Sequence, residues 1–134
     1  MQLKTVGLLS IKDRKLLLAY SRNKQCFYLP GGKIDVDETA LSSLRREIME
    51  ELNIVLEEAD LEFYTHISAP AYGEEAGIQM EQDCFLVLRP IEPIPSAEIS
   101  SLQYFTLQDY LLEPRQAPGA IMILEILKEK GEID

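Results

Sequence analysis

The sequence predicts a layered domain of the α/β or α+β class, and three observations support this. Short apolar runs bounded by turn-forming residues are interspersed with two amphipathic segments of helical period. The length of 134 residues suits one hydrophobic core, so we expect residues 1–134 to form a single domain. A content of 46% hydrophobic and 27% charged residues is typical of a folded globular protein rather than a disordered one.

The first part of the chain predicts three strands. Residues 6–11 and 16–20 are apolar runs on either side of a turn-like Lys-Asp-Arg-Lys sequence, and we expect these two runs to pair. Residues 26–29 form a third candidate strand, which ends at the Pro-Gly-Gly sequence that follows it.

A helical period begins after this turn and covers residues 38–52. Its apolar residues recur at spacings of three and four and form one stripe, Leu41, Leu44, Ile48 and Leu52. We expect Asp37 to cap the N-terminus of the helix, because a short acidic side chain suits the free N–H groups and the positive end of the helix dipole. Asn53 is a suitable left-handed stop at the other end.

The second half of the chain predicts three more strands and a final helix. The strands cover residues 61–68, 83–88 and 102–106, with a polar, glycine-containing segment at 72–82 and a proline-rich loop before the last strand. An amphipathic helix covers residues 120–130, with Gly131 just beyond its end.

The charge balance limits the classes of partner. The chain has 13 Lys and Arg against 23 Asp and Glu, a formal net charge of −10. This excess argues against a nucleic-acid-binding protein, which needs a basic surface to neutralise phosphates. A small phosphorylated ligand stays compatible, because one bound metal or a few basic side chains can reverse the local charge.

The sequence also predicts no membrane span and a reduced compartment. No apolar run approaches the about 20 residues that a membrane helix needs, and the first residues lead directly into a strand without a signal-peptide layout. Cys26 and Cys84 are too few for a disulfide scaffold, and His66 as the only histidine disfavours a zinc site. We therefore expect a cytoplasmic protein.

Three carboxylates share one face of the predicted helix. Glu47, Glu50 and Glu51 stand at relative positions 0, +3 and +4, beside the apolar stripe. Arg46 can pair with Glu50, but one guanidinium does not neutralise three carboxylates. Clustered carboxylates suit a hard cation such as Mg²⁺, although an acidic face exposed to solvent would have the same pattern.

The residues around these glutamates resemble a family signature. Gly32 is followed by five residues, Glu38, seven residues and then the Arg-Glu-Ile-Met-Glu-Glu-Leu-Asn-Ile sequence of residues 46–54. This is similar to the signature of the Nudix hydrolase family at every fixed position but the last glycine, which here is Asn53. Asparagine tolerates a positive φ better than most residues, so we expect a small stability cost rather than loss of the metal-binding helix. Asp37 also stands where family members often have glycine.

The resemblance implies a fold and a set of metal ligands. The fold is a Nudix-type α/β/α sandwich with a mixed β-sheet, and the cofactor is Mg²⁺ or Mn²⁺. The implied ligands are the carboxylates of Glu47, Glu50 and Glu51 and the backbone carbonyl of Gly31.

The resemblance also implies supporting and catalytic roles. Arg46 would orient the glutamates and Glu38 would brace the loop before the helix. The general base would be Glu47 or a glutamate on a later loop, for which Glu98 is the first candidate and Glu81 the reserve.

Candidate substrate contacts follow from the same resemblance. Arg22 and Lys33 stand where a cation would meet a phosphate, and each could equally be an ordinary surface residue. Phe27 and Tyr28 are candidates for a base-stacking wall, or for the core. Pro70 and Tyr72 match markers of two different substrate groups in the family and so do not discriminate between them.

The implied activity is hydrolysis of the phosphoanhydride bond of a nucleotide by water attack at phosphorus. The short chain and the sequence before the signature favour a nucleoside triphosphate, as in mutator-type members. Two alternatives stay open: a pyrophosphatase of ADP-ribose or another nucleoside-diphosphate sugar, and a Nudix-fold ligand sensor without turnover. The expected partners are a small-molecule nucleotide and, because family members are often dimers, a second copy of the chain.

Overall fold

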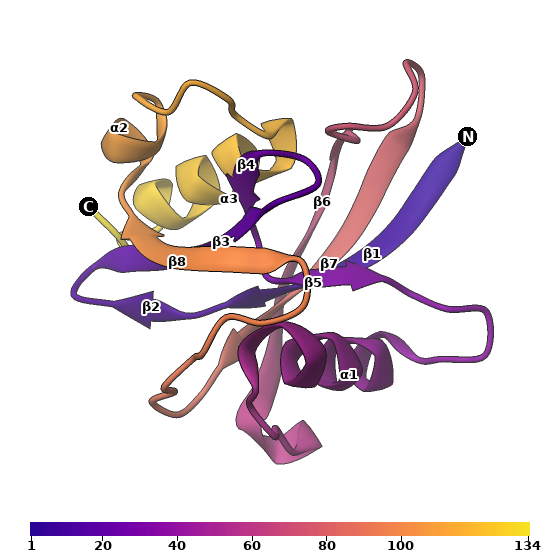
Figure 1. Ribbon diagram of the computed structural model, residues 1–134. Helices are drawn as coiled ribbons and strands as arrows, with labels where there is room; N and C mark the ends of the chain where they lie inside the picture. The colour runs from indigo at the N-terminus through magenta and orange to yellow at the C-terminus, as the bar shows by residue number, and fades with distance from the viewer.

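The computed structural model describes residues 1–134 and contains two four-stranded β-sheets (Figure 1). The first sheet has the order β5-β1-β7-β6, with β1 at Gln2–Leu9, β5 at Gly31–Lys33, β6 at Leu61–Pro70 and β7 at Gln79–Val87. In the second sheet β3 pairs with all the others, which are β2 at Ile11–Lys12, β3 at Lys15–Ser21, β4 at Cys26–Tyr28 and β8 at Ile99–Phe105. The helices are α1 at Ala40–Leu52, α2 at Leu107–Tyr110 and α3 at Pro118–Glu129, with a 3₁₀ turn η1 at Glu58–Asp60.

The first sheet is mixed and lies between helices. Its central strands β1 and β7 run parallel, while β5 and β6 are antiparallel to their neighbours. Helix α1 packs on one side of the sheet and α3 on the other, as Figure 1 shows. The predicted α/β fold with a mixed sheet is therefore confirmed.

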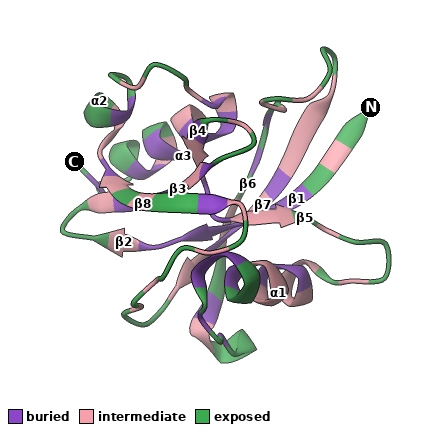
Figure 2. Cartoon of the chain, viewed as in Figure 1, coloured by how far each residue is buried: buried purple, intermediate pink, exposed green.

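The hydrophobic core has two parts, one on each side of this sheet. On one side the buried residues of α1, Leu44, Ile48 and Leu52, pack in a cluster with Val6 and Leu8 of β1. On the other side the buried face of α3 packs in a larger cluster that also includes strand residues and Tyr110. Figure 2 shows the buried positions concentrated where the helices meet the strands. The predicted stripe of the first helix is confirmed, although Leu41 is only partly buried.

The prediction that residues 6–11 pair with residues 16–20 is wrong for most of the run. Only β2 pairs with β3, while residues up to Leu9 lie between β5 and β7 in the other sheet. The chain changes sheets at Ser10, whose carbonyl accepts a hydrogen bond of 2.9 Å from the Leu17 N–H. One continuous apolar run therefore serves two sheets, and its sequence carries no mark at the crossing.

The ends of α1 show one wrong prediction and one that is confirmed. The N-cap is Thr39, not Asp37: its hydroxyl accepts from the Ser42 N–H and the Ser42 hydroxyl accepts from the Thr39 N–H, both at 3.1 Å. This reciprocal pair of bonds starts the helix later than the predicted residue 38. At the C-terminus Asn53 adopts the expected left-handed conformation, with φ 58° and ψ 38°.

The second half of the chain follows the predicted order with shifted boundaries. Strand β7 begins at Gln79 instead of residue 83, because its polar first half is paired on both edges, to β1 and to β6. Helix α3 begins at Pro118, a residue that suits the first position of a helix since its missing N–H would have no partner there. The short α2 and η1 were not predicted, since so few residues show no period. No helix combines the length and hydrophobicity that a membrane crossing requires.

Candidate active site

A cavity of about 440 Å³ lies between the first sheet, helix α1 and the start of α3. Its charged wall includes Glu47 and Glu51 of α1 and Glu98 from the loop before β8. An uncharged wall comes from β1, β7 and the beginning of α3. The cavity thus joins an acidic surface to a mostly neutral one and has the size of a small-molecule site.

Glu47 and Glu51 are carboxylates partly or wholly withdrawn from solvent, Glu47 half-buried and Glu51 buried. Glu51 is 6% exposed, and its Oε1 accepts a hydrogen bond of 3.2 Å from the Gly31 N–H. Burial raises the pKa of Glu51 to about 8, and the neighbouring charge of Glu47 adds to the rise. Burial also raises the pKa of Glu47, although Arg46 donates a hydrogen bond of 3.0 Å to its Oε1. Negative charge is therefore costly here without a bound cation.

The two glycines, which the sequence placed in a turn, begin strand β5 and let its backbone approach these carboxylates closely. A Cβ on Gly32 would lie 2.6 Å from Cδ of Glu47, which is too near for any side chain. Gly31 has a φ of +142°, and a Cβ there would lie 2.0 Å from the Val6 carbonyl oxygen. Both glycines are therefore required by the geometry, one for the strand pairing and the other for the position of Glu47.

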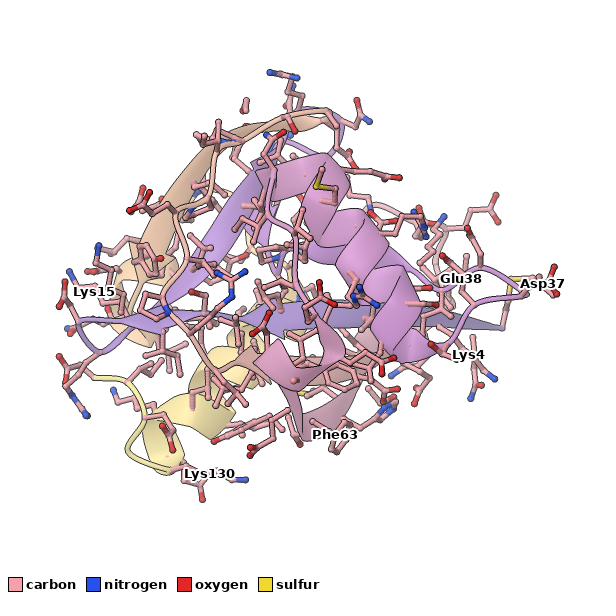
Figure 3. The ribbon with its side chains drawn as sticks, turned by 90° about the horizontal axis from the view of Figure 1, so that it is seen from below. Lys4, Lys15, Asp37, Glu38, Phe63 and Lys130 are labelled. Carbon is pink, nitrogen blue, oxygen red and sulfur yellow. The ribbon has the colours of Figure 1, made fainter.

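Arg46 joins the helix to the loop before it. Its Nε and Nη2 donate hydrogen bonds of 2.9 and 2.8 Å to the two carboxylate oxygens of Glu38, a bidentate pair. These bonds lower the pKa of Glu38 to about 2. Figure 3 shows Glu38 in the loop that leads into α1. Glu38 does not line the cavity but holds Arg46, which does.

Glu50 stands apart from the other two predicted carboxylates. Its side chain is 54% exposed, does not line the cavity and lies 3.5 Å from Nη1 of Arg46. No group of three His, Cys, Asp or Glu side chains has the arrangement of a metal site. The structure therefore brings together Glu47 and Glu51, while Glu50 lies on the solvent side of the same helix.

The chemistry of the donors nevertheless fits a divalent cation. Glu51 has no cationic side chain as a partner, and its carboxylate is buried beside that of Glu47. Oxygen donors of this kind suit Mg²⁺ or Mn²⁺. A cation would offset the cost of withdrawing these charges from water, which is the main cause of both raised pKa values, and Glu50 lies on the same helix about one turn from Glu47.

Glu98 and Arg22 are connected through the loop before β8. Glu98 lines the cavity, and its Oε2 accepts hydrogen bonds from Ser21 Oγ and Asn23 Nδ2, both at 3.1 Å. Arg22 does not line the cavity: its Nη1 donates to the Ala97 carbonyl at 2.5 Å, and its backbone N–H donates to the Glu98 carbonyl at 3.0 Å. The structure thus places Arg22 as a support of the loop that carries Glu98.

The remaining predicted residues fall in different places. Lys33 borders the cavity and forms an ion pair of 3.5 Å with Glu74. Glu81 lies outside the cavity, because it is on the opposite face of the sheet, where it contacts His66 at 2.9 Å. As a general base for chemistry in this cavity, the reserve candidate Glu81 is therefore wrong.

The aromatic pair predicted from the sequence is divided between the cavity and the core. Tyr28 lines the cavity, whereas Phe27 packs edge-on against Tyr20 and Phe105. Side chains in a strand alternate between its two faces, so neighbours seldom serve the same site.

The neutral wall of the cavity contains residues that the sequence analysis missed. They are Leu3 and Thr5 of β1, Met80 and Gln82 of β7, and Ala117, Gly119 and Ala120 at the start of α3. Parallel pairing places Leu3 opposite Met80 and Thr5 opposite Gln82. The alternation of these side chains could be read from the sequence, but the pairing of segments so far apart could not.

The mixed sheet, the two glycines of β5 and the glutamates that α1 presents to the cavity define an α/β domain with the features of a hydrolase site. The NUDIX domain family model matches residues 1–125, and the chain belongs to this family. It is an enzyme of this class, a Nudix hydrolase of pyrophosphate bonds.

Solved structures show the same fold. A MutT NUDIX hydrolase from Burkholderia pseudomallei superposes with a TM-score of 0.74 and 24% identity, covering 93% of this chain and 97% of that one. The NUDIX domain of Shewanella oneidensis NrtR, solved in complex with ADP ribose, superposes with a TM-score of 0.69 and 24% identity, covering 97% of this chain and 88% of that one. An ADP-ribose pyrophosphatase from Streptococcus suis superposes with a TM-score of 0.66 and 19% identity, covering 96% of this chain and 91% of that one. The comparison with curated proteins gave no match.

Proposed function

We propose that this enzyme hydrolyses a nucleoside triphosphate at a phosphoanhydride bond, by attack of water at phosphorus. The observation that carries the proposal is the pair of the half-buried Glu47 and the buried Glu51, set beside strand β5 at one wall of the cavity. A chain this acidic would repel a polyphosphate, so a bound cation is needed to hold one there.

The ligands we propose for Mg²⁺ or Mn²⁺ are the carboxylates of Glu47, Glu50 and Glu51 and the carbonyl of Gly31. When bound, the cation neutralises phosphate charge and lowers the pKa of water. Nudix hydrolases generally use divalent metals, and the donors described above fit one. The protein itself orients the ligand Glu47. Arg46 donates a hydrogen bond of 3.0 Å to Glu47 and is held in turn by a hydrogen bond of 2.8 Å to Glu38.

We propose Glu98 as the general base. Its Oε2 is held by Ser21 and Asn23, which orients the carboxylate and leaves Oε1 without a partner in the chain. Glu47 is the alternative base, but Arg46 already occupies one of its oxygens. A carboxylate that is oriented and has a free oxygen is better suited to accept a proton from water.

For the substrate we favour a nucleoside triphosphate. Lys33 and Arg46 border the cavity and can meet phosphates, and Tyr28 offers an aromatic face to a base. The fold of the Burkholderia pseudomallei MutT NUDIX hydrolase, which spans nearly the same length, is compatible with this choice.

The second candidate is a pyrophosphatase of ADP-ribose or another nucleoside-diphosphate sugar. It is favoured by the similar folds of an ADP-ribose pyrophosphatase and of a NUDIX domain solved with ADP ribose. A sensor without turnover is the third candidate, and the intact Glu47 and Glu51 argue against it. We also propose a cytoplasmic location, which the free Cys26 and Cys84 support, and a homodimer as the assembly.

The proposal is tested by Mg²⁺-dependent release of phosphate or pyrophosphate over a panel of nucleoside triphosphates and nucleoside-diphosphate sugars. Wild type is compared with Glu50→Gln and Glu51→Gln, and with Glu58→Gln as the control, since Glu58 is exposed on η1 away from the cavity. We expect wild type to hydrolyse nucleoside triphosphates. Glu50→Gln and Glu51→Gln should lower the rate, and Glu58→Gln should keep it. Turnover of sugar nucleotides alone would establish the second candidate, and a folded wild type without any turnover would establish the sensor.

A further inference from the structure

Gln82 presents a free amide to the neutral part of the cavity. The residue is only 7% exposed, yet its side-chain amide forms no hydrogen bond with another group of the chain. The hydroxyl of Thr5, its neighbour on β1, already donates to the Glu81 carbonyl at 3.4 Å. The amide is open to the cavity and no side chain occupies it, so its oxygen can accept a hydrogen bond from a ligand that enters there.

The start of α3 adds free donors to the same cavity. Gly119 and Ala120 are buried, line the cavity and follow Pro118 in the first turn of the helix. Their N–H groups have no acceptor within the chain, and the N-cap residue Ala117 has no side chain that could provide one. The N-terminal end of the helix therefore presents N–H groups and a partial positive charge to a ligand.

The acceptor of Gln82 and the donors at the start of α3 line the same cavity, and they are the kinds of group that one edge of a nucleobase can bond. A ring carbonyl has two lone pairs and can accept from both N–H groups at the start of α3. A ring N–H next to that carbonyl can donate to the amide oxygen of Gln82. Adenine presents an amino group in place of the carbonyl, so N–H would face N–H, and its ring nitrogens each have a single lone pair.

We infer that Gln82 and the start of α3 select nucleotides whose base carries a ring carbonyl beside a ring N–H, as in hypoxanthine, guanine or uracil, over adenine nucleotides. This inference rests on the proposed function only in placing a nucleotide in this cavity, and it goes further by naming the base. Gln82 is the side chain that reads the ring N–H, while the N–H groups at the start of α3 read the carbonyl beside it.

The experiment compares the binding of inosine and adenosine 5′-monophosphates, which differ only at the base edge in question. Dissociation constants are measured by calorimetry with Mg²⁺, so that binding is read without turnover. We expect the inosine nucleotide to bind about tenfold more tightly, the discrimination typical of one good pair of hydrogen bonds. Guanosine and uridine 5′-monophosphates then show whether the cavity prefers a purine or a pyrimidine.

Two variants on the same strand assign the selectivity. Gln82→Met keeps the length of the side chain and removes its amide, and we expect it to lower the ratio of the two constants by weakening the binding of the inosine nucleotide, while the N–H groups of α3 keep part of the preference. Gln79→Met is the matched control, because Gln79 lies outside the cavity and donates to Ser68 at 3.0 Å. It should leave the ratio unchanged.

Several results would overturn the inference. They are equal or reversed affinities in wild type, no binding of either nucleotide by the folded protein, and a ratio that Gln82→Met does not change. The proposed hydrolysis is judged separately, by the turnover assay with the α1 variants. Selective binding without turnover would reject the proposed hydrolysis and keep the base assignment, while turnover without base preference would do the reverse.

Discussion

The backbone N–H of Gly31 donates a hydrogen bond of 3.2 Å to the Oε1 atom of Glu51, and this bond joins strand β5 to the acidic helix. No cationic side chain accompanies the bond, and burial raises the pKa of Glu51 to about 8. The carboxyl therefore retains a proton at neutral pH when no cation is bound. A bound proton and a bound cation are alternative ways to stabilise the same buried group.

The first prediction concerns the stability of the metal-free protein. The folded pKa of Glu51, about 8, lies above its ordinary value of 4.5, so its favourable contribution is complete below 4.5 and is lost as the pH rises through about 8. We expect the free energy of unfolding of wild type to fall over this range in a chelator. Glu51→Gln, which keeps an oxygen for the Gly31 N–H but does not titrate, should show a smaller fall.

Urea unfolding at a series of pH values measures this difference. Added Mg²⁺ should restore the stability of wild type above pH 8 and have less effect on Glu51→Gln, since ligand binding to the folded state stabilises it. The variant should also lose turnover by about a hundredfold or more. Parallel stability curves for the two proteins would contradict the assignment of Glu51 as the titrating group.

The second prediction concerns the bidentate contact between Arg46 and Glu38. Lysine has a single ammonium and cannot bond both oxygens of Glu38 while also reaching Glu47. We expect Arg46→Lys to lower kcat by about 10- to 100-fold through the displacement of Glu47, as for other groups that orient metal ligands. Arg45→Lys is the control, because the neighbouring Arg45 bonds the Leu56 carbonyl at 2.6 Å instead. Equal effects of the two variants would indicate a general helix defect.

The third prediction separates the two candidate bases. Glu98→Gln removes the proton acceptor that we propose, and we expect kcat to fall by about a hundredfold or more while the affinity for Mn²⁺ is unchanged. Glu47→Gln should weaken Mn²⁺ binding as well as kcat, because Glu47 is a proposed ligand. Titration of Mn²⁺ by electron paramagnetic resonance, together with the kinetics, measures both quantities. An intact kcat in Glu98→Gln would return the role of base to Glu47.

The acidic helix could be predicted because its information is local. The spacing of Glu47 and Glu51 and the apolar stripe beside them lie within a few turns of one helix, where positions three and four apart are neighbours. The exposure of Glu50 could not be predicted, because Arg46 forms its shorter ion pairs with Glu38 and Glu47 and only a longer one with Glu50. The position of Glu38 depends on the path of the loop before the helix, which the whole fold determines.

The neutral wall of the cavity could not be predicted for a different reason. Thr5 and Gln82 meet through a parallel pairing of two strands, and the start of α3 reaches them from a third part of the chain. Parallel strands are joined by long crossover connections, so no short segment of the sequence determines their register. Similarly, the apolar run of residues 6–11 gave no sign that it would divide between two sheets at Ser10.

The fourth prediction concerns Asn53, which stands where the family signature has glycine. It adopts φ 58°, and its Nδ2 donates a hydrogen bond of 2.8 Å to the Ile94 carbonyl. We expect Asn53→Ala to cost about 1–2 kcal/mol, since alanine is strained in this conformation and cannot make the bond. Asn53→Gly relieves the strain but loses the bond, so its free energy of unfolding should change by less. Chemical denaturation compares the variants, and an alanine variant as stable as wild type would show the cap to be unimportant.

The last prediction concerns His66, on the opposite face of the sheet from the cavity. Its Nδ1 lies 2.7 Å from Asp83 and its Nε2 2.9 Å from Glu81. Hydrogen bonds to these carboxylates raise the pKa of His66 above 6.5, while the bond from His66 lowers that of Glu81 below 4.5.

The raised pKa of His66 and the lowered pKa of Glu81 together determine how the stability changes with pH. The contribution of His66 is complete below 6.5 and is lost as the pH rises through its raised pKa, whereas that of Glu81 is present above 4.5 and is lost as the pH falls through its lowered pKa. The advantage of wild type over His66→Gln should therefore be largest between these limits and shrink on either side. Urea unfolding of the two proteins measures this, and the effect of Glu51 cancels in the difference because the sites are separate. Since His66 is the only histidine, a difference that does not vary with pH would mean that the imidazole is not charged between its carboxylates.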